Sequence, residues 1–394
     1  MKLFHYGLAL AAATVLLSGC SNNEPEQPQP AVFIPGNSEV EIRFGANDAD
    51  LSTSVDKRHT VTGDADLEMG VFCLARSIQN QSEGVPAIDW FGDNSYSACL
   101  MKNIRTQKTS NTLTWEGKYF YPISQFYTYE FYGYYPYVED GESITYTPGT
   151  GSRAVVHYTI DGTQDIIWGR ATAEGTLYGY SARFFRYEEH KDDIPNIALK
   201  HLLTRLQFQV ETGASTENGG EPFPDADKVS VKSIAIRDAI SGVDLVVADL
   251  ARRSPSTGMQ MSERLEIREP QETAEFTLRE SDDSDEPMTP VPLPTELGTP
   301  KRVGGSIMLV PAGEYLLKVI LHKDGDGPED PGTDLETEKS LKVESIVESG
   351  GQKIFNPGVS YMVTIKVNDF KEVDAQATLS DWQYSANNPP TVEL

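Results

Sequence analysis

Apolar and polar residues alternate with a period of two along short segments of the chain. Residues 40–44 (VEIRF) form the first such segment, and Gly45 follows it. This alternation is typical of a half-buried β-strand. We therefore expect a strand at residues 40–44 that ends at Gly45, with Val40, Ile42 and Phe44 on its buried face.

Similar patterns recur through the rest of the chain, separated by Gly, Pro and acidic clusters. The strands that they predict are residues 67–75, 124–138, 165–169, 229–237, 242–247, 274–278, 305–310, 314–322, 341–346, 360–367 and 378–382. In the first of these, Gly70 marks a bulge or a close approach of another chain segment. Residues 112–120 (TLTWEGKYF) predict a hairpin, and residues 197–210 a segment that starts as a helix and ends as a strand.

Short strands with turn residues between them, and without long helical periods, predict an all-β fold. The length of 394 residues suits two domains with substantial cores. The composition changes near Pro195 after a polar run. We therefore expect two β-sandwich domains in tandem, at residues 59–195 and 196–394.

The first twenty residues have the pattern of a bacterial lipoprotein signal. Lys2 is followed by an apolar run at residues 8–17 (LALAAATVLL), half the roughly 20 residues that a membrane-spanning helix needs. Small residues then precede Cys20. We expect residues 1–19 to be removed and Cys20 to be acylated, so that its lipid anchors the chain in the outer membrane. The alternative is an ordinary secretory signal in which the cysteine has no such role.

A tether and a basic site surround the first predicted strand. Residues 21–30 (SNNEPEQPQP) are polar and proline-rich, and such a segment cannot bury enough apolar surface to fold. Residues 46–62 have no apolar period, and they contain Lys57-Arg58 among polar neighbours, as an exposed protease site would. Residues 20–58 are therefore predicted to be a lipidated tether with a removable first strand.

The charge and the cysteines limit the classes of partner and the compartment. A formal charge of -26 argues against nucleic acids and anionic membranes as partners. No apolar run after the signal could span a bilayer. If Cys20 carries lipid, Cys73 and Cys99 remain in an oxidising compartment, where they could form a disulfide or stay as separate buried thiols.

The most aromatic segment, residues 124–138 (SQFYTYEFYGYYPYV), has two interpretations. Its aromatic residues favour a core strand. Exposed tyrosines, with Tyr134 and Tyr135 as candidates, would instead bind sugars by stacking. The core strand is the preferred interpretation.

No motif for catalysis, for a nucleotide or for a metal is present. The sequence lacks H-E-x-x-H, G-x-S-x-G, paired C-x-x-C and phosphate-loop patterns. We therefore expect no catalytic residues, no cofactor and no metal, and His201 is interpreted as a histidine satisfied within the fold. Residues 324–334 resemble the start of a calcium loop, but Pro328 and Glu329 break that pattern, so a solvated hairpin tip is predicted. Residues 281–286 (SDDSDE) are interpreted in the same way.

Taken in order, these features resemble the fimbrillin family of the Bacteroidetes, the subunits of lipoprotein-derived (type V) pili. The segments that carry the resemblance are the lipobox at Cys20, residues 40–44 before the basic site, 70–72 (GVF), 132–137 (YGYYPY), 165–169 (DIIWG), 199–208, 310–315 (VPAGEY), 356–361 (NPGVSY) and 381–382 (DW). Each segment is short, and their order along nearly the whole chain is the specific feature.

The resemblance implies two transthyretin-like β-sandwich domains and cleavage after Arg58 by a trypsin-like protease of the gingipain type. Loss of the first strand would open an apolar site for a strand of another fimbrial subunit. Only residues 383–394 follow Trp382, and they contain Asn387-Asn388-Pro389-Pro390, which is poor material for a donor strand. A structural shaft subunit, an accessory tip subunit and a lipid-anchored base subunit therefore stay open.

A glycan-binding surface lipoprotein is the alternative function, with a host or bacterial surface ligand as its partner. A surface hydrolase is a third candidate, because many carboxylates are present but no acid/base pair can be chosen.

Overall fold

The computed structural model describes residues 40–48, 66–77, 90, 99–123, 127–148, 152–171, 180–215, 218–249, 264–327, 329–342 and 354–380. Strands dominate these residues, and the helical turns among them are two 3-10 helices, η1 (Phe184–Arg186) and η2 (Ala226–Lys228). The predicted all-β class is confirmed. Within the described part of the chain, no helix has the length and apolar character needed to cross a membrane.

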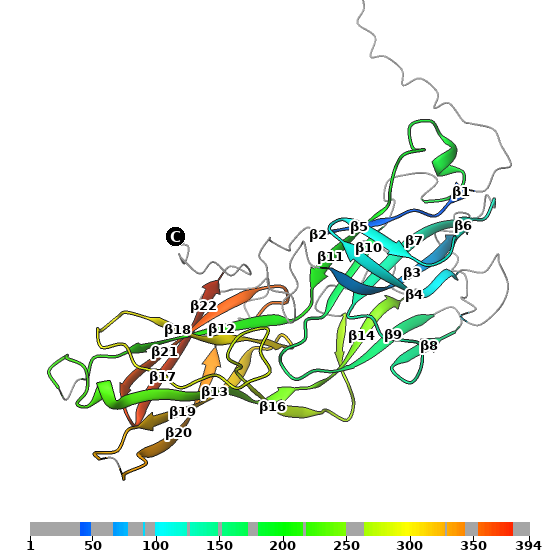
Figure 1. Cartoon of the computed structure of the whole chain (residues 1–394). Coiled ribbons are helices and arrows are strands. Elements are labelled where there is room, and N and C mark those ends of the chain that lie inside the picture. The colour runs from blue at the N-terminus through cyan, green and yellow to red at the C-terminus, as the bar shows by residue number, and fades with distance from the viewer. Residues whose placement is uncertain are drawn as a thin grey trace, which may run out of the picture.

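One sheet closes on itself and contains the N-terminal segment. Its order is β10-β11-β2-β5-β4-β3-β7, and β2 lies between β11 and β5 (Figure 1). Its strands are β2 (Gly45–Asp48), β3 (Leu67–Ser77), β4 (Cys99–Thr109), β5 (Thr112–Trp115), β7 (Tyr127–Tyr135), β10 (Ile167–Ala171) and β11 (Asn196–His201). Strand β2 therefore completes the circle of hydrogen-bonded strands.

Two smaller groups of strands adjoin this closed sheet. Strand β1 (Val40–Glu41) pairs with β6 (Phe120–Tyr121). A four-stranded sheet has the order β15-β14-β9-β8. Its strands are β8 (Ile144–Thr147), β9 (Arg153–Thr159), β14 (Gly242–Asp249) and β15 (Leu265–Ile267).

Two further sheets form the other end of the molecule (Figure 1). The first has the order β18-β12-β21-β22, and the second β16-β13-β19-β20 with β17 also paired to β13. Their strands are β12 (Thr204–Thr212), β13 (Val229–Ile240), β16 (Thr273–Thr277), β17 (Val291–Pro292), β18 (Lys301–Leu309), β19 (Glu314–Lys323), β20 (Thr333–Lys342), β21 (Ser360–Asp369) and β22 (Glu372–Ser380).

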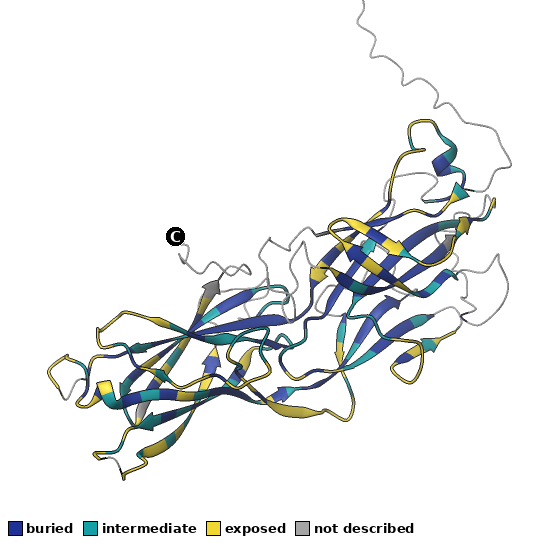
Figure 2. Ribbon diagram, in the orientation of Figure 1, coloured by how far each residue is buried: buried dark blue, intermediate teal, exposed yellow. Residues whose placement is uncertain are grey.

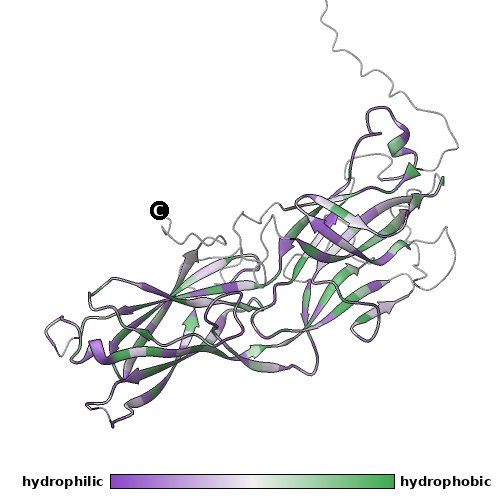
Figure 3. Cartoon of the chain, in the orientation of Figure 1, coloured by the Kyte–Doolittle hydropathy of each residue, from purple (hydrophilic) through white to green (hydrophobic). Residues whose placement is uncertain are grey.

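The core follows the alternation seen in the sequence. In β19, Tyr315, Leu317, Val319 and Leu321 are buried and their neighbours are not. Buried residues run along the middle of the strands at both ends of the molecule, and exposed residues gather in the connections (Figure 2). Apolar and polar segments alternate along the strands in the hydropathy colouring, and polar residues predominate in the connections (Figure 3). Period-two burial is the physical basis of the all-β prediction.

Several predicted elements differ from the structure. Gly45 begins β2 instead of ending a strand, because its amide bonds to Pro195 of a distant segment. Residues 112–120 are not a hairpin: β5 pairs with β4, whereas β6 pairs with β1. The segment at 197–210 has no helical start. Its first residues belong to strand β11, in which Ile197, Leu199 and His201 are buried and alternate with exposed residues.

Sheet pairing crosses the expected domain boundary near Pro195. Strand β11 begins at Asn196, yet it pairs with β10 and β2 of the closed sheet. Strand β14 likewise pairs with β9 from the N-terminal half. The division into domains at residues 59–195 and 196–394, and their transthyretin-like topology, stay predictions.

Candidate functional site

The candidate site is the place that residues 40–48 occupy, with β1 on β6 and β2 in the closed sheet. Ile42 and Phe44 are 1% and 4% exposed, and Val40 is half-buried. Glu41 and Arg43 between them are exposed. The alternation of residues 40–44 therefore places its larger apolar side chains against the core, although only Val40 and Glu41 are paired as a strand there.

Backbone hydrogen bonds attach this segment to three separate parts of the chain. The Ile42 amide donates to the Tyr119 carbonyl at 2.8 Å, and the Gly45 amide to the Pro195 carbonyl at 2.8 Å. The Ala46 amide donates to the Asn111 carbonyl at 3.4 Å. These bonds hold the segment between β11 on one side and the β4–β5 hairpin on the other.

Phe44 is the aromatic anchor of the segment. Its ring stacks on Trp115 with centroids 4.4 Å apart and planes 10° apart, and on Phe131 at 4.8 Å and 30°. Trp115 comes from β5 and Phe131 from β7, which are far apart in the order of the sheet. Burying such a side chain contributes about 1.5–3 kcal/mol, and an aromatic pair about 0.5–1.5 kcal/mol more.

Gly45 is required by a close approach of neighbouring chain segments. A Cβ atom at this position would lie 2.8 Å from the Asn111 carbonyl oxygen and 2.8 Å from the Asn196 side-chain oxygen. The amide side chain of Asn196 could move, but the Asn111 oxygen belongs to the backbone. Any other residue at position 45 would therefore force the β4–β5 turn to shift.

The polar residues of the segment add only weak interactions. Glu41 lies 3.4 Å from the Lys118 ammonium, and both side chains are largely exposed. The Arg43 guanidinium donates to the Lys191 carbonyl at 2.9 Å. Exposed ion pairs contribute about 0–1 kcal/mol. The apolar face of the segment, and not its charges, holds it in place.

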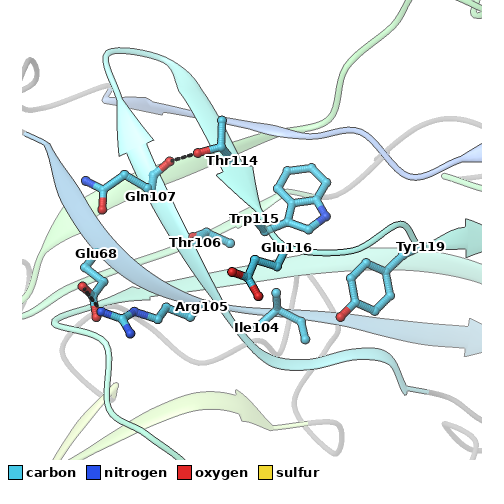
Figure 4. Close-up of a pocket in the computed structure, with 9 residues that line it drawn as sticks. All are labelled: Glu68, Ile104, Arg105, Thr106, Gln107, Thr114, Trp115, Glu116 and Tyr119. Carbon is cyan, nitrogen blue, oxygen red and sulfur yellow. Dashed lines mark hydrogen bonds and ion pairs between the residues drawn. The ribbon is translucent and has the colours of Figure 1, made fainter.

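A pocket of about 640 Å³ lies beside the site, and Trp115 is part of it (Figure 4). Its lining residues are Glu68, Ile104, Arg105, Thr106, Gln107, Thr114, Trp115, Glu116 and Tyr119. The rings of Trp115 and Tyr119 lie toward one end of it, and Glu68 and Arg105 form a 2.7 Å ion pair at the other (Figure 4). The hydrogen bond that the Arg105 guanidinium donates to the Glu68 carboxylate raises the pKa of Arg105. The pocket thus combines half-buried aromatic rings with polar and charged groups, and sequence reasoning did not single it out.

Residues 127–135 of the aromatic segment form the core strand β7, as the preferred interpretation expected. Tyr134 is fully buried, and its hydroxyl donates to the Asn103 side-chain oxygen at 2.6 Å. Burial raises the pKa of Tyr134. Gly70 allows this packing, because a Cβ there would lie 2.1 Å from the Tyr134 ring. A sugar platform that includes Tyr134 is therefore wrong, because its ring faces no solvent.

Cys73 and Cys99 are free thiols in the structure. They lie on neighbouring strands, but Cys73 is opposite Met101 and Cys99 is opposite Leu74, with a register shift between them. Burial raises the pKa of Cys73, and it raises that of Cys99 to about 12. High pKa values disfavour the reactive thiolate. A disulfide between the two cysteines stays a prediction.

The histidine and acidic clusters have structural partners. His201 is buried, and its Nδ1 lies 2.6 Å from the Asp165 carboxylate, which is also buried.

Residues 324–332 join β19 to β20, which confirms a hairpin tip there. The run at 281–286 is not simply solvated, because Asp282 accepts a 2.6 Å bond from the buried Arg205. In the part of the chain that the structure describes, no group of three or more His, Cys, Asp or Glu residues could hold a metal ion.

Three predicted site residues, Cys20, Lys57 and Arg58, lie outside the described residues. Their roles in lipidation and cleavage stay predictions. The structure does place β2 in the closed sheet and β1 beside it on β6, and its next described residue, Asp66, directly precedes β3. The residues that receive the segment, Tyr119, Trp115 and Phe131, were not singled out from the sequence, because each belongs to an ordinary strand pattern.

The fold and the site define an all-β protein in which an N-terminal segment completes a closed sheet. No family model matches the chain, and no curated protein matches it in sequence. A solved structure from Bacteroides uniformis described as a "putative cell adhesion protein" is 14% identical, with a TM-score of 0.46, and the match covers 89% of this chain and 100% of that one. One from Bacteroides ovatus with the same description is 13% identical, with a TM-score of 0.45 and coverages of 89% and 100%. The fimbrial anchor protein Mfa2 from Porphyromonas gingivalis is 8% identical, with a TM-score of 0.33 and coverages of 87% and 97%.

Proposed function

We propose that this protein is a structural or accessory subunit of surface fimbriae. It is exported as a lipoprotein and anchored through Cys20, and a trypsin-like or gingipain-type protease cuts it after Arg58. A strand of a neighbouring subunit then replaces residues 40–48. The observation that supports this most is the burial of Ile42 and Phe44, which lie between the lipid attachment point and the basic site.

Removal of residues 40–48 would create the conditions for strand exchange. Strands β11 and β5 would lose their common neighbour, β2. The backbone groups of β11 that pair with residues 45–48 would be left without partners, beside the apolar site of Phe44. Unpaired edges of this kind readily accept an extended peptide.

The uncut chain resists exchange for an energetic reason. Ile42 and Phe44 each contribute about 1.5–3 kcal/mol by burial, and the segment is covalently attached, so it returns to its site whenever it leaves. Cleavage after Arg58 removes that attachment and lets the segment diffuse away. Proteolysis is thus the step that permits assembly.

Processing at Arg58 can be tested by N-terminal sequencing of mature protein from the cell surface. We expect a start at His59, and an Arg58→Ala variant, alone or with Lys57→Ala, should keep its lipidated start at Cys20 and fail to assemble. Arg252→Ala with Arg253→Ala is the matched control, because it removes another dibasic pair and should leave processing unchanged. A start at Cys20 in every wild-type molecule would contradict the cleavage step.

Glycan binding is a second candidate function, supported by the pocket at Trp115 and Tyr119. Half-buried aromatic rings beside amide, hydroxyl and carboxylate groups are suited to stacking on a sugar ring while bonding its hydroxyls. We expect the uncut protein to bind on a glycan array, and Tyr119→Ala to abolish that binding while Phe120→Ala preserves it. Absence of wild-type binding, or retention by Tyr119→Ala, would exclude this pocket as a glycan site.

A further inference from the structure

We infer that the site occupied by residues 42–46 selects its incoming strand by a short sequence pattern, and that this strand comes from a different protein. The pattern is a large apolar residue, any residue, an aromatic residue, glycine and a small residue. The inference rests on the proposed strand exchange and identifies the chemistry of the strand that would replace Ile42–Ala46.

The aromatic position is defined by the surroundings of Phe44. The site presents Trp115 at 4.4 Å and Phe131 at 4.8 Å, both in stacked orientation. An aliphatic side chain would fill less of the space between these rings and would lose the stacking. The position two residues before it requires a large apolar side chain, because Ile42 is 1% exposed.

The glycine position is the most restrictive feature. The Gly45 amide donates a hydrogen bond to the Pro195 carbonyl. In this position the Cα of Gly45 lies between the Asn196 side chain and the Asn111 carbonyl oxygen. A Cβ atom 2.8 Å from the Asn111 carbonyl oxygen is closer than real side chains come. A strand without glycine at this position could enter only by moving the turn between β4 and β5.

The small position follows from burial and from the register. Ala46 is fully buried, and it lies opposite Ile197 of β11. Protein interiors are close-packed, so a larger side chain here would have to displace its neighbours. Residues 45–48 pair in parallel with residues 196–199, whereas only Gly45 pairs with β5. Strand β11 therefore sets the register in which the pattern is read.

The sequence of this chain indicates where the incoming strand does not come from. The complete pattern, with Gly, Ala or Ser as the small residue, occurs only at residues 42–46. Segments that match four of the five positions include residues 166–170 (IIWGR), which has arginine at the small position, and residues 382–386 (WQYSA), which has serine at the glycine position. Once cleavage has removed residues 1–58, a second copy of this chain offers no segment with the complete pattern, and we assign the donor to a different subunit.

The experiment measures the exchange of peptides into the full chain after cleavage at Arg58. A fluorescent peptide with the sequence of residues 38–48 is bound to the cut protein, and unlabelled variants compete for the site in fluorescence anisotropy. We expect Phe44→Ala and Gly45→Ala peptides to compete about tenfold more weakly or worse than the native peptide. The Arg43→Ala peptide, changed at an exposed position, should compete within about threefold of it.

The outcomes separate this inference from the proposed function. If the native peptide does not bind the cut protein, the proposed strand exchange is wrong. If it binds, but the Gly45→Ala peptide competes equally well, strand exchange stands and the sequence pattern is wrong. A peptide of residues 378–388, which aligns Ser385 with Gly45, should compete at least about tenfold more weakly. Equal competition by that peptide would overturn the assignment to a different subunit.

Discussion

Single side chains decide how firmly the N-terminal segment is held. Phe44 packs against strands of the closed sheet and is 4% exposed, whereas Phe120 lies on β6 outside that sheet and is 38% exposed. The Phe44 ring stacks on Trp115 and Phe131, which lie about 70–90 residues further along the chain, and Phe120 lies opposite Glu41. Substitution of the two residues should therefore have very different consequences.

Phe44→Ala should lower the free energy of unfolding of the uncut chain by about 3–5 kcal/mol, because it leaves a cavity between Trp115 and Phe131. Urea unfolding followed by circular dichroism measures this change. Phe120→Ala is the control and should cost less than about 1 kcal/mol. Equal losses for the two variants would show that Phe44 does not anchor the segment.

At the scale of elements, a polar cluster joins the closed sheet to its neighbour. Asp140 accepts hydrogen bonds from Asn103 of β4 at 2.9 Å and from Tyr146 of β8 at 2.6 Å, and it lies 3.2 Å from the Lys102 ammonium. Burial acts to raise the pKa of Asp140, but these donors outweigh it and hold the pKa below its ordinary value. The connection therefore depends on the charged carboxylate.

This cluster predicts a loss of stability in acid. Because the pKa of Asp140 is lower in the folded state, its contribution is fully present above the unfolded pKa near 3.8 and is lost as the pH falls through the folded value. Between about pH 6 and pH 2.5, the wild-type Tm should fall a few degrees more than that of Asp140→Asn. The effect is small because the carboxylate is partly exposed. Glu142→Gln is the nearby exposed control, and its Tm should change with pH as that of the wild type does. If the Tm of Asp140→Asn also followed the wild type, the Asp140 carboxylate would not be the source of the acid sensitivity.

For the whole molecule, residues 40–48 affect one end only. Strand β2 contacts β11 and β5, whereas the sheet β18-β12-β21-β22 is built from other strands at the far end. Removal of the segment should therefore loosen the closed sheet locally and leave the distant sheet intact.

Hydrogen exchange can check this separation. After cleavage and removal of residues 1–58, the backbone amides of β11 that bond to residues 45–48 should exchange at least about tenfold faster than in the uncut chain, because their hydrogen-bond partners are gone. Amides of β21 and β22 should be unchanged and serve as the internal reference. Addition of a peptide of residues 38–48 should restore slow exchange, and uniform acceleration throughout the chain would contradict the local effect.

The sequence by itself determined the all-β class, the inward face of Ile42 and Phe44, and the core role of the strand around Tyr134. These features follow from local alternation and residue type, which need no knowledge of the neighbours. Only the tertiary structure decided that β2 closes a sheet between β11 and β5, that Gly45 begins this strand, and that Trp115 and Phe131 receive Phe44. These depend on segments about 65–150 residues away along the chain, and local patterns do not encode which distant strands pair.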